Sequence, residues 1–357
     1  MANRVTDRPS VVAALFCLAL PGCILERPEE PEMAVGEGEL AVSSLRPPSA
    51  CATSATFKFS TSGDITTAWI GGTEVAWFTE GAYTVRMAGP LRTFVVGAPV
   101  PLITTTQWVR TLAAPFDSAA MSTKDLRAWL DAARAENCTT GTPDILALAF
   151  EYTEGTPNDA GYEFGADFHD YLGVDWDAPD ANLIAAEPAQ LGKLDCSGYM
   201  RLVFGERTNF VHEGVDTRIP LSLHERAGSI PRTSREQYRS GPGKIVVPFR
   251  TEPPGAAPFH GEPTPEELAA IEVGDLVFFD TACEYDALVP SCGADWTTIS
   301  HIGLYVGEDA LGNRRFLSSR IVADGPTVAN TGGFSIFNAT PGVSHAYPRW
   351  FRAARRF

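Results

Sequence analysis

A cysteine at the expected start of a helix is the first feature of this chain that could do chemistry. Asp195 precedes Cys196, and an aspartate side chain can accept hydrogen bonds from the first free N–H groups of a helix. The apolar residues that follow predict a helix to Phe204, which Gly205 would end in the left-handed conformation. The positive end of the helix dipole lowers the pKa of a thiol in the first turn, so the pattern favours a reactive thiolate. The alternative is a small buried core residue, because free cysteine is often buried.

A histidine on a predicted strand is the candidate partner of this thiol. The apolar positions of residues 299–306 alternate with His301, Gly303 and Tyr305, as in a strand. His301 is therefore expected to face away from the apolar layer, beside a glycine that leaves space. Residues 273–279 predict a turn that leads into a strand buried on both faces. A single cysteine with a distant histidine is a candidate nucleophile and base, although a lone strand histidine is more often a structural residue.

The first fifty residues have the pattern of an export signal followed by a tether. Two arginines precede an apolar run over residues 11–20, which is too short for a stable membrane anchor. Leu20-Pro21-Gly22-Cys23 then resembles a bacterial lipobox, whose cysteine is lipidated after cleavage. We therefore expect a signal peptide over residues 1–22 and an exported lipoprotein, anchored through Cys23 and facing the periplasm or cell envelope. Plain secretion is the alternative. Residues 23–50 are rich in Glu, Pro and Gly and predict a solvated tether.

The number of cysteines indicates which thiol stays free after export. Of the seven cysteines, one leaves with the leader and one is the expected lipid site, which leaves Cys51, Cys138, Cys196, Cys283 and Cys292. Cys283 and Cys292 bracket a short polar loop and are the best candidates for a disulfide, and a bond between Cys51 and Cys138 would join the ends of the N-terminal domain. An odd number in an oxidising compartment leaves one free thiol, Cys196. No pair of cysteines or histidines has zinc-ligand spacing, so no metal is expected.

Four motifs in a fixed order make residues 143–357 resemble the NlpC family of cell-wall cysteine peptidases. They are Asp-Cys-Ser-Gly at 195–198, Ile-Pro-Arg-Thr-Ser-Arg-Glu-Gln at 230–237, Gly-Asp-Leu-Val-Phe-Phe at 274–279 and His-Ile-Gly-Leu-Tyr-Val-Gly at 301–307, and residues 352–356 resemble the family's last strand. The resemblance implies a papain-like α+β fold, in which a helix bearing the cysteine packs on an antiparallel sheet bearing the histidine. It also implies hydrolysis of peptidoglycan stem peptides between D-glutamate and a diamino acid, without a cofactor.

The same resemblance implies roles for individual residues. Cys196 is the nucleophile and His301 its base. The residue that orients the base lies on the next strand, where this chain has Ser318 in place of the usual His, Asn or Gln. Tyr162 matches a tyrosine that helps to hold the oxyanion or the substrate backbone. Residues 166–193 are an insertion relative to the family and are candidates for the cleft rim.

Two alternatives to the peptidase remain open. Because a serine is a weaker orienting group, the chain could be a catalytically weak or inactive enzyme retained as a cell-wall binding lipoprotein. A papain-like site can also carry out amidase or acyl-transfer chemistry on another substrate, and the fold does not separate these reactions.

The remainder of the chain predicts supporting structure. Residues 51–120 have the pattern of a β meander, a small all-β domain that either supports the enzyme or binds the wall. A linker helix is expected over residues 121–142, a second helix from Pro143 to Tyr152, and a surface excursion over residues 240–265. Three histidines are expected to be surface residues, namely His212, His224 and His260.

Charge limits the partners of the protein. The net charge is -16, from 28 Lys plus Arg against 44 Asp plus Glu. This balance argues against a nucleic-acid partner and against electrostatic docking on anionic lipids, so membrane contact is expected only through the lipid anchor. The sequence leaves the oligomeric state open.

Overall fold

The computed structural model describes residues 51, 56–95, 102–140, 142–208, 216–250, 262–281, 296–330, 334–338 and 346–357. The predicted leader, lipid site and tether lie outside these residues, as do the predicted Cys283–Cys292 bond and two of the histidines, His212 and His260. The described elements are helices and antiparallel sheets, which confirms the α+β class. Residues Arg46–Phe357 group as one compact unit. Among the described helices, none is long and apolar enough to cross a membrane.

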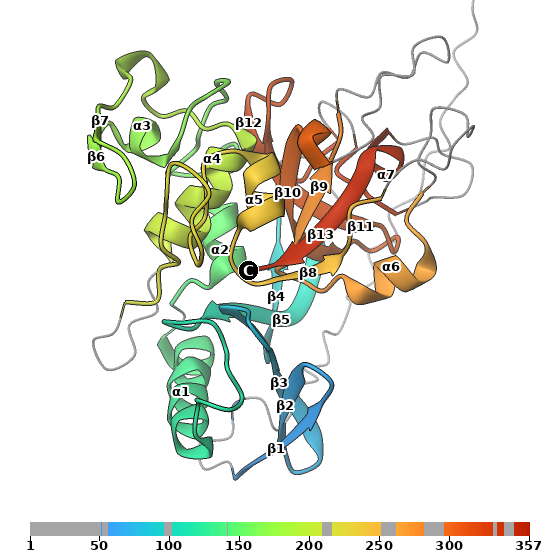
Figure 1. Ribbon diagram of the computed structural model, residues 1–357. Coiled ribbons are helices and arrows are strands. Elements are labelled where there is room, and N and C mark those ends of the chain that lie inside the picture. The colour runs from blue at the N-terminus through green and yellow to red at the C-terminus, as the bar shows by residue number, and fades with distance from the viewer. Residues whose placement is uncertain are drawn as a thin grey trace, which may run out of the picture. The chain divides into compact units, whose positions relative to one another are not determined.

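A five-stranded antiparallel meander forms the N-terminal part of this unit (Figure 1). Its strands follow chain order and are β1 (Phe57–Ser62), β2 (Ile65–Ile70), β3 (Thr73–Thr79), β4 (Thr84–Phe94) and β5 (Ile103–Thr111). The meander was expected, and the pairing of β4 with β5 has a register shift between Ala88 and Arg92. The sequence did not predict β5, because its threonine-rich start lacks alternating apolar residues.

One helix covers the meander core. Helix α1 (Thr123–Ala135) begins at Ser122, whose side chain accepts the Asp125 N–H, and a π-helical turn, Glu136–Thr140, continues it. Its apolar face is buried in the same cluster as strand residues such as Phe57 and Phe78, and consists of Leu126, Trp129, Leu130 and Ala133. Helix α1 lies within the range expected for a linker helix and packs on the meander.

The second predicted helix begins later than expected. Helix α2 spans Ile145–Phe150, and the Asp144 side chain caps it by accepting the Ala147 N–H. Pro143 thus lies before the cap rather than in the first turn. The sequence prediction was wrong here because aspartate, a strong N-cap residue, follows the proline directly.

A six-stranded antiparallel sheet forms the centre of the C-terminal part. The strand order is β12 (Gly325–Thr327), β11 (Arg314–Arg320), β10 (His301–Glu308), β9 (Leu276–Phe279), β13 (Phe351–Arg356) and β8 (Lys244–Val247). The predicted surface excursion over residues 240–265 therefore contains an edge strand, β8, which pairs with β13. Residues 251–261 of that excursion lie outside the described part.

The C-terminal part contains further short elements. They are α3 (Phe168–Leu172), β6 (Trp176–Asp177), β7 (Leu183–Ile184), the 3₁₀ turn Pro188–Gln190, α5 (Ser234–Ser240), α6 (Pro265–Ala270), the 3₁₀ turn Trp296–Thr298 and α7 (Ala346–Trp350).

The cysteine-bearing helix packs on the sheet that bears the histidine. Helix α4 (Cys196–Arg201) continues as a π-helical turn, Leu202–Arg207. Its apolar residues share one buried cluster with the sheet residues Ile302, Leu304 and Val306. The sequence predicted that Gly205 ends the helix, but the helical turns continue past it to Arg207. A Cβ atom at Gly205 would lie 2.3 Å from Leu221 Cδ2, so this glycine permits close packing.

The sheet is apolar on both faces, which corrects one expectation for the histidine. The predicted alternation in β10 is confirmed, since Tyr305 belongs to a second buried cluster with Phe279 and Phe316. The space beside Gly303 is not open, however. The Phe316 ring fills it, and a Cβ at Gly303 would lie 2.5 Å from Phe316 Cδ2.

Polar contacts join the meander to the C-terminal part of the unit. The Thr84 N–H donates to the Phe357 carbonyl oxygen at 2.7 Å. Arg86 forms an ion pair with Glu272 at 2.6 Å, and Arg356 Nη1 donates to Thr79 Oγ1 at 2.9 Å. The residues predicted as two domains therefore share hydrogen bonds and ion pairs.

The Cys51–Cys138 disulfide is present and closes a separation of 87 residues. Since a cross-link of this length restricts the unfolded chain, we expect the double variant Cys51→Ser/Cys138→Ser to lose about 3 kcal/mol of unfolding free energy. Urea denaturation followed by tryptophan fluorescence measures this. In the presence of a reductant, which opens any other disulfide in both proteins, the midpoints of wild type and variant should become equal. Equal midpoints for oxidised wild type and variant would contradict the prediction.

Candidate active site

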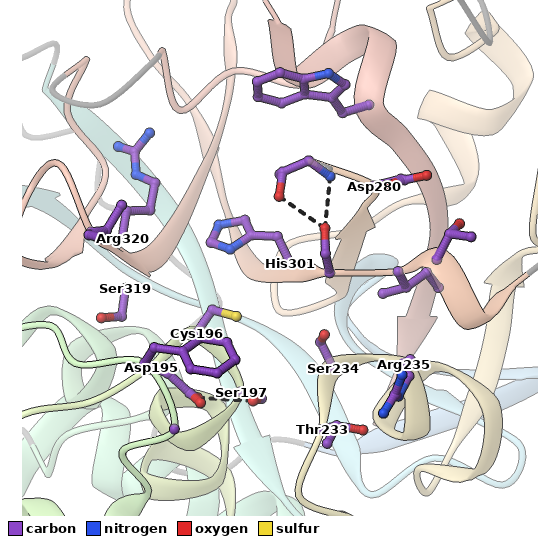
Figure 2. A pocket seen from close by; sticks show the side chains of 18 of the residues that line it. Asp195, Cys196, Ser197, Thr233, Ser234, Arg235, Asp280, His301, Ser319 and Arg320 are labelled. Carbon is purple, nitrogen blue, oxygen red and sulfur yellow. Dashed lines mark hydrogen bonds between the residues drawn. The ribbon is translucent and has the colours of Figure 1, made fainter. Parts of the chain in front are cut away.

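A cavity of about 870 Å³ lies at the N-terminal end of α4. Figure 2 shows side chains from several elements around it. Three residues predicted for the site line this cavity, namely Cys196, His301 and Tyr162. The fourth, Ser318, is fully buried and bonded to His301. The structure thus brings together residues that lie up to 156 positions apart in the chain, from 162 to 318.

The start of α4 has the predicted cap. Asp195 Oδ1 accepts the Gly198 N–H at 2.7 Å and the Ser197 hydroxyl at 2.9 Å. The Asp195 N–H donates to the Ala166 carbonyl oxygen at 3.0 Å, so the helix start lies against this segment. A Cβ at Gly198 would lie 2.4 Å from that same oxygen. The glycine of the motif is therefore required by packing, and the whole motif fixes where Cys196 projects.

The histidine is held from its far ring nitrogen. His301 Nε2 and Ser318 Oγ are 3.0 Å apart, and both side chains are buried. Ser319, the next residue of β11, also lines the cavity, and its hydroxyl donates to the Leu194 carbonyl oxygen at 2.7 Å. The bond at Nε2 leaves Nδ1 as the ring nitrogen available to the cavity.

The cysteine sulfur lies beside the start of the histidine strand. The backbone N–H of Ile302, the residue after His301, lies close enough to the Cys196 sulfur to act to lower the pKa of the thiol. Figure 2 shows the His301 ring and the Cys196 side chain among the residues that line the cavity. Cys196 is a free thiol and is partly exposed. No hydrogen bond joins its sulfur to the imidazole in the described structure.

Burial keeps the Cys196 thiol and the His301 imidazole neutral, whereas the sequence predicted a thiolate at Cys196. Loss of water contact, followed by the Asp195 carboxylate, raises the pKa of the Cys196 thiol to about 12. Burial, followed by the positive charge of Arg320, lowers the pKa of His301 to about 3. Desolvation and the capping carboxylate outweigh the helix dipole on which the sequence prediction relied. The resting pair at neutral pH is a thiol and a neutral imidazole.

Tyr162 presents a protonated hydroxyl to the same cavity. Burial, with smaller contributions from Cys196 and Asp195, raises the pKa of Tyr162 to about 12. Among the described residues its hydroxyl has no hydrogen-bond partner. Its backbone N–H donates to Asp324 Oδ1 at 3.1 Å, and Asp324 itself adopts a positive φ of 50°. A strained turn therefore positions Tyr162, and the hydroxyl can donate a hydrogen bond into the cavity.

The insertion does not form the cleft rim. None of the residues lining the cavity comes from 166–193, a range that is described throughout. The rim carries three exposed apolar side chains instead, Phe164, Ile321 and Val322, which are 83%, 72% and 69% exposed. The mouth of the cavity thus offers apolar surface to a ligand.

The insertion contributes a buried ion network that the sequence did not reveal. Asp167 accepts from Arg201 Nε at 2.9 Å, and Arg201 is fully buried. Arg232 extends the network, since its Nη2 donates to Asp195 Oδ2 at 2.7 Å and its Nη1 to Ser197 Oγ at 2.8 Å. Burial acts to raise the pKa of Asp167, but Arg201 and Arg232 hold it below its usual value.

The motif at 230–237 holds α5 against α4. Thr233 and Glu236 form a capping box at the start of α5. Gln237 is fully buried, and its Nε2 donates to the carbonyl oxygens of Ser197 and Pro231, each at 3.1 Å. This segment therefore braces the turn that bears Cys196.

Two other histidines lie away from the cavity. His224 is exposed, as predicted. His169 is buried between Asp170 and the Trp176 ring, with Nδ1 3.5 Å from Asp170 Oδ1. Within the described part of the chain, no three His, Cys, Asp or Glu side chains group as metal ligands would.

Comparison of the chain with models of known protein families, with curated proteins and with solved structures finds no match.

The neutral resting pair predicts how Cys196 reacts with iodoacetamide. Because the raised thiol pKa makes the thiolate fraction grow with pH, the alkylation rate should rise about tenfold per pH unit from about pH 6 to about pH 9. Peptide mapping by mass spectrometry follows the label, with Cys196→Ser as the unlabelled control. A plateau across this range would instead indicate a thiolate paired with an imidazolium.

Proposed function

We propose that this chain is a papain-like cysteine peptidase of the NlpC type that hydrolyses peptidoglycan stem peptides. Cys196 is the nucleophile, His301 the general base and Ser318 the residue that orients the base. The observation that carries the proposal is the 3.0 Å hydrogen bond between His301 Nε2 and Ser318 Oγ. The next residue of the histidine strand, Ile302, has its backbone N–H close to the Cys196 sulfur at the start of α4. A nucleophile, a base and an orienting group in this relation recur in acyl-transfer enzymes.

Ser318 selects the tautomer that the base needs. To accept a proton from sulfur, Nδ1 of His301 must be unprotonated, so the ring proton resides on Nε2 and is donated to Ser318 Oγ. The ring is neutral at working pH because its pKa lies near 3. The base is therefore in the form that can accept a proton before any substrate arrives.

Proton transfer accompanies the attack on the scissile carbonyl. As the Cys196 sulfur bonds to the carbonyl carbon, the thiol proton passes to Nδ1 of His301. The C–N bond then breaks, and His301 returns the proton to the departing amine. Water attacks the resulting thioester and gives a proton to Nδ1, the C–S bond breaks, and the proton returns to sulfur. The products are a carboxylic acid, an amine and the free thiol.

The negative oxygen of each tetrahedral intermediate needs hydrogen-bond donors. The Tyr162 hydroxyl and the backbone N–H of Cys196 fill this role in the proposed mechanism. The support for Tyr162 is its place in the cavity lining and its raised pKa, which keeps the hydroxyl protonated. No cofactor is required by this chemistry.

The cavity and the expected export are consistent with a stem-peptide substrate. Ligand pockets commonly measure about 300–1,000 Å³, and the cavity volume of about 870 Å³ suits several residues of a peptide. The proposed scissile bond joins D-glutamate to a diamino acid. In this proposal the enzyme acts outside the cytoplasm as a lipoprotein anchored through Cys23.

A second candidate is a cell-wall binding lipoprotein with little or no catalysis. The favouring observation is the neutral Cys196–His301 pair, which lacks a hydrogen bond between sulfur and imidazole. A base with a pKa near 3 is weak. The cavity would then retain its ligand without cutting it. Amidase or acyl-transfer chemistry would use the same residues and differ in the acceptor.

Digestion of purified peptidoglycan separates these candidates. We expect the wild type to release fragments cut within the stem peptide and Cys196→Ala to release none, because the thioester cannot form. Mass analysis of the soluble fragments identifies the bond, and a pull-down assay measures wall binding by both proteins. Wall binding without cleavage by the wild type would support the binding protein, and neither cleavage nor binding would favour acyl transfer on another substrate.

Substitution of the orienting serine tests its role separately from folding. Ser318→Ala should lower kcat by about tenfold to a hundredfold, because the imidazole loses its fixed tautomer, and should leave KM nearly unchanged. Ser318→Asn, which retains a hydrogen-bonding group, should recover part of the loss. Ser222→Ala is the matched control, because it removes the hydroxyl of a buried serine that lies outside the cavity lining. Equal kcat for wild type and Ser318→Ala, measured on a stem peptide, would remove Ser318 from the mechanism.

A further inference from the structure

The charge of the cavity lining is opposite in sign to that of the chain. The chain has a net charge of -16. The charged side chains that line the cavity, apart from Cys196 and His301, are Asp195, Asp280, Arg232, Arg235 and Arg320. Two carboxylates thus face three guanidinium groups, and the lining carries an excess of one positive charge. A cavity of this sign raises the local concentration of anionic ligands.

Most of these charges are already engaged by the protein. Arg232 and Asp195 form an ion pair at 2.7 Å. Asp280 is buried, with Oδ2 3.7 Å from Arg352 Nη2. Arg320 is also buried, and its Nη2 donates to a backbone carbonyl at 2.9 Å and to a serine hydroxyl at 2.8 Å.

Arg235 is the exception among the charged lining residues. It lies in the first turn of α5 and is exposed. It forms no hydrogen bond or ion pair with any described residue. The nearest carboxylate in sequence, Glu236, is committed to the capping box, where it accepts the Thr233 hydroxyl at 2.6 Å. Figure 2 shows Arg235 beside Thr233 and Ser234 on the wall of the cavity.

We propose that Arg235 binds a free carboxylate of the substrate, so that the cavity selects carboxylate-bearing peptides. The proposal rests on the function proposed above and adds a residue that determines specificity. A guanidinium group offers a planar fork of donors that matches a carboxylate in a bidentate pair. A glutamyl residue joined to its neighbour through one carboxyl keeps the other free beside the scissile bond. That carboxylate is the group assigned to Arg235.

Binding to the inactive Cys196→Ala variant tests this assignment without turnover. The two probes are L-alanyl-γ-D-glutamyl-L-lysine amide and the same peptide with the glutamyl carboxylate converted to a carboxamide. Isothermal titration calorimetry should give about tenfold tighter binding of the acid, since a hydrogen-bonded charge pair contributes this much at a partly exposed site. Cys196→Ala/Arg235→Gln should bind both peptides equally. Arg235→Lys should retain part of the preference, because it keeps the charge and loses the fork.

The matched control lies one turn further along the same helix. Arg239 is exposed, lies outside the cavity lining and forms an ion pair with Glu225 at 3.5 Å. Arg239→Gln removes the same charge from α5, so a general electrostatic effect would appear in both variants. The acid preference should persist in Cys196→Ala/Arg239→Gln.

The outcomes separate this proposal from the proposed function. An acid preference that survives Arg235→Gln would overturn the assignment, as would binding of neither peptide. If the wild type cleaves both peptides at equal kcat/KM, the peptidase stands and the role of Arg235 falls. If the preference depends on Arg235 but no peptide is cleaved, the recognition site stands and the peptidase falls.

Discussion

The fixed position of the α4 N-terminus is the constraint on which the site depends. Asp195 caps the helix and pairs with Arg232, while Asp167 holds the fully buried Arg201 one turn further on. Removing one partner of such a buried pair costs about 3–5 kcal/mol, because the remaining charge has no water to solvate it. The network therefore adds little net stability, but it favours one position of the α4 N-terminus over others. That position determines where the Cys196 sulfur lies.

The sheet supplies the second half of the site with the same rigidity. Adjacent antiparallel strands place His301 and Ser318 side by side, and aromatic rings pack on that face. This dry environment has a chemical consequence, since it raises the thiol pKa and lowers the imidazole pKa. An ion pair would be expensive at rest, so the proposed mechanism moves the proton only as the new bond forms. Burial thus fixes the positions of Cys196 and His301, and it also keeps the Cys196 thiol protonated at rest.

Local sequence signals predicted much of this arrangement. Three of its features follow from residues that are close together in the sequence, and the structure has each of them. They are the helix cap at Asp195, the alternation around His301, and the place of Ser318 on the following strand. The ion network was missed because Asp167 and Arg201 are 34 residues apart. The direction of the thiol pKa was mistaken for a related reason. A helix dipole is visible in sequence, whereas the desolvation that opposes it exists only after the sheet, α4 and the cavity wall have packed. Gly205 was likewise taken for a helix end, because its contact with Leu221 is tertiary.

The central claim is that the sulfur of Cys196 carries the acyl group during turnover. Acid quenching of wild-type enzyme during turnover of a stem peptide, followed by intact-mass and peptide-level mass spectrometry, measures this directly. The account predicts a mass increase equal to the acyl part of the substrate, located on the peptide that contains Cys196 and released by hydroxylamine. Substrate turnover with no adduct on that peptide, or with the adduct on another residue, would contradict it.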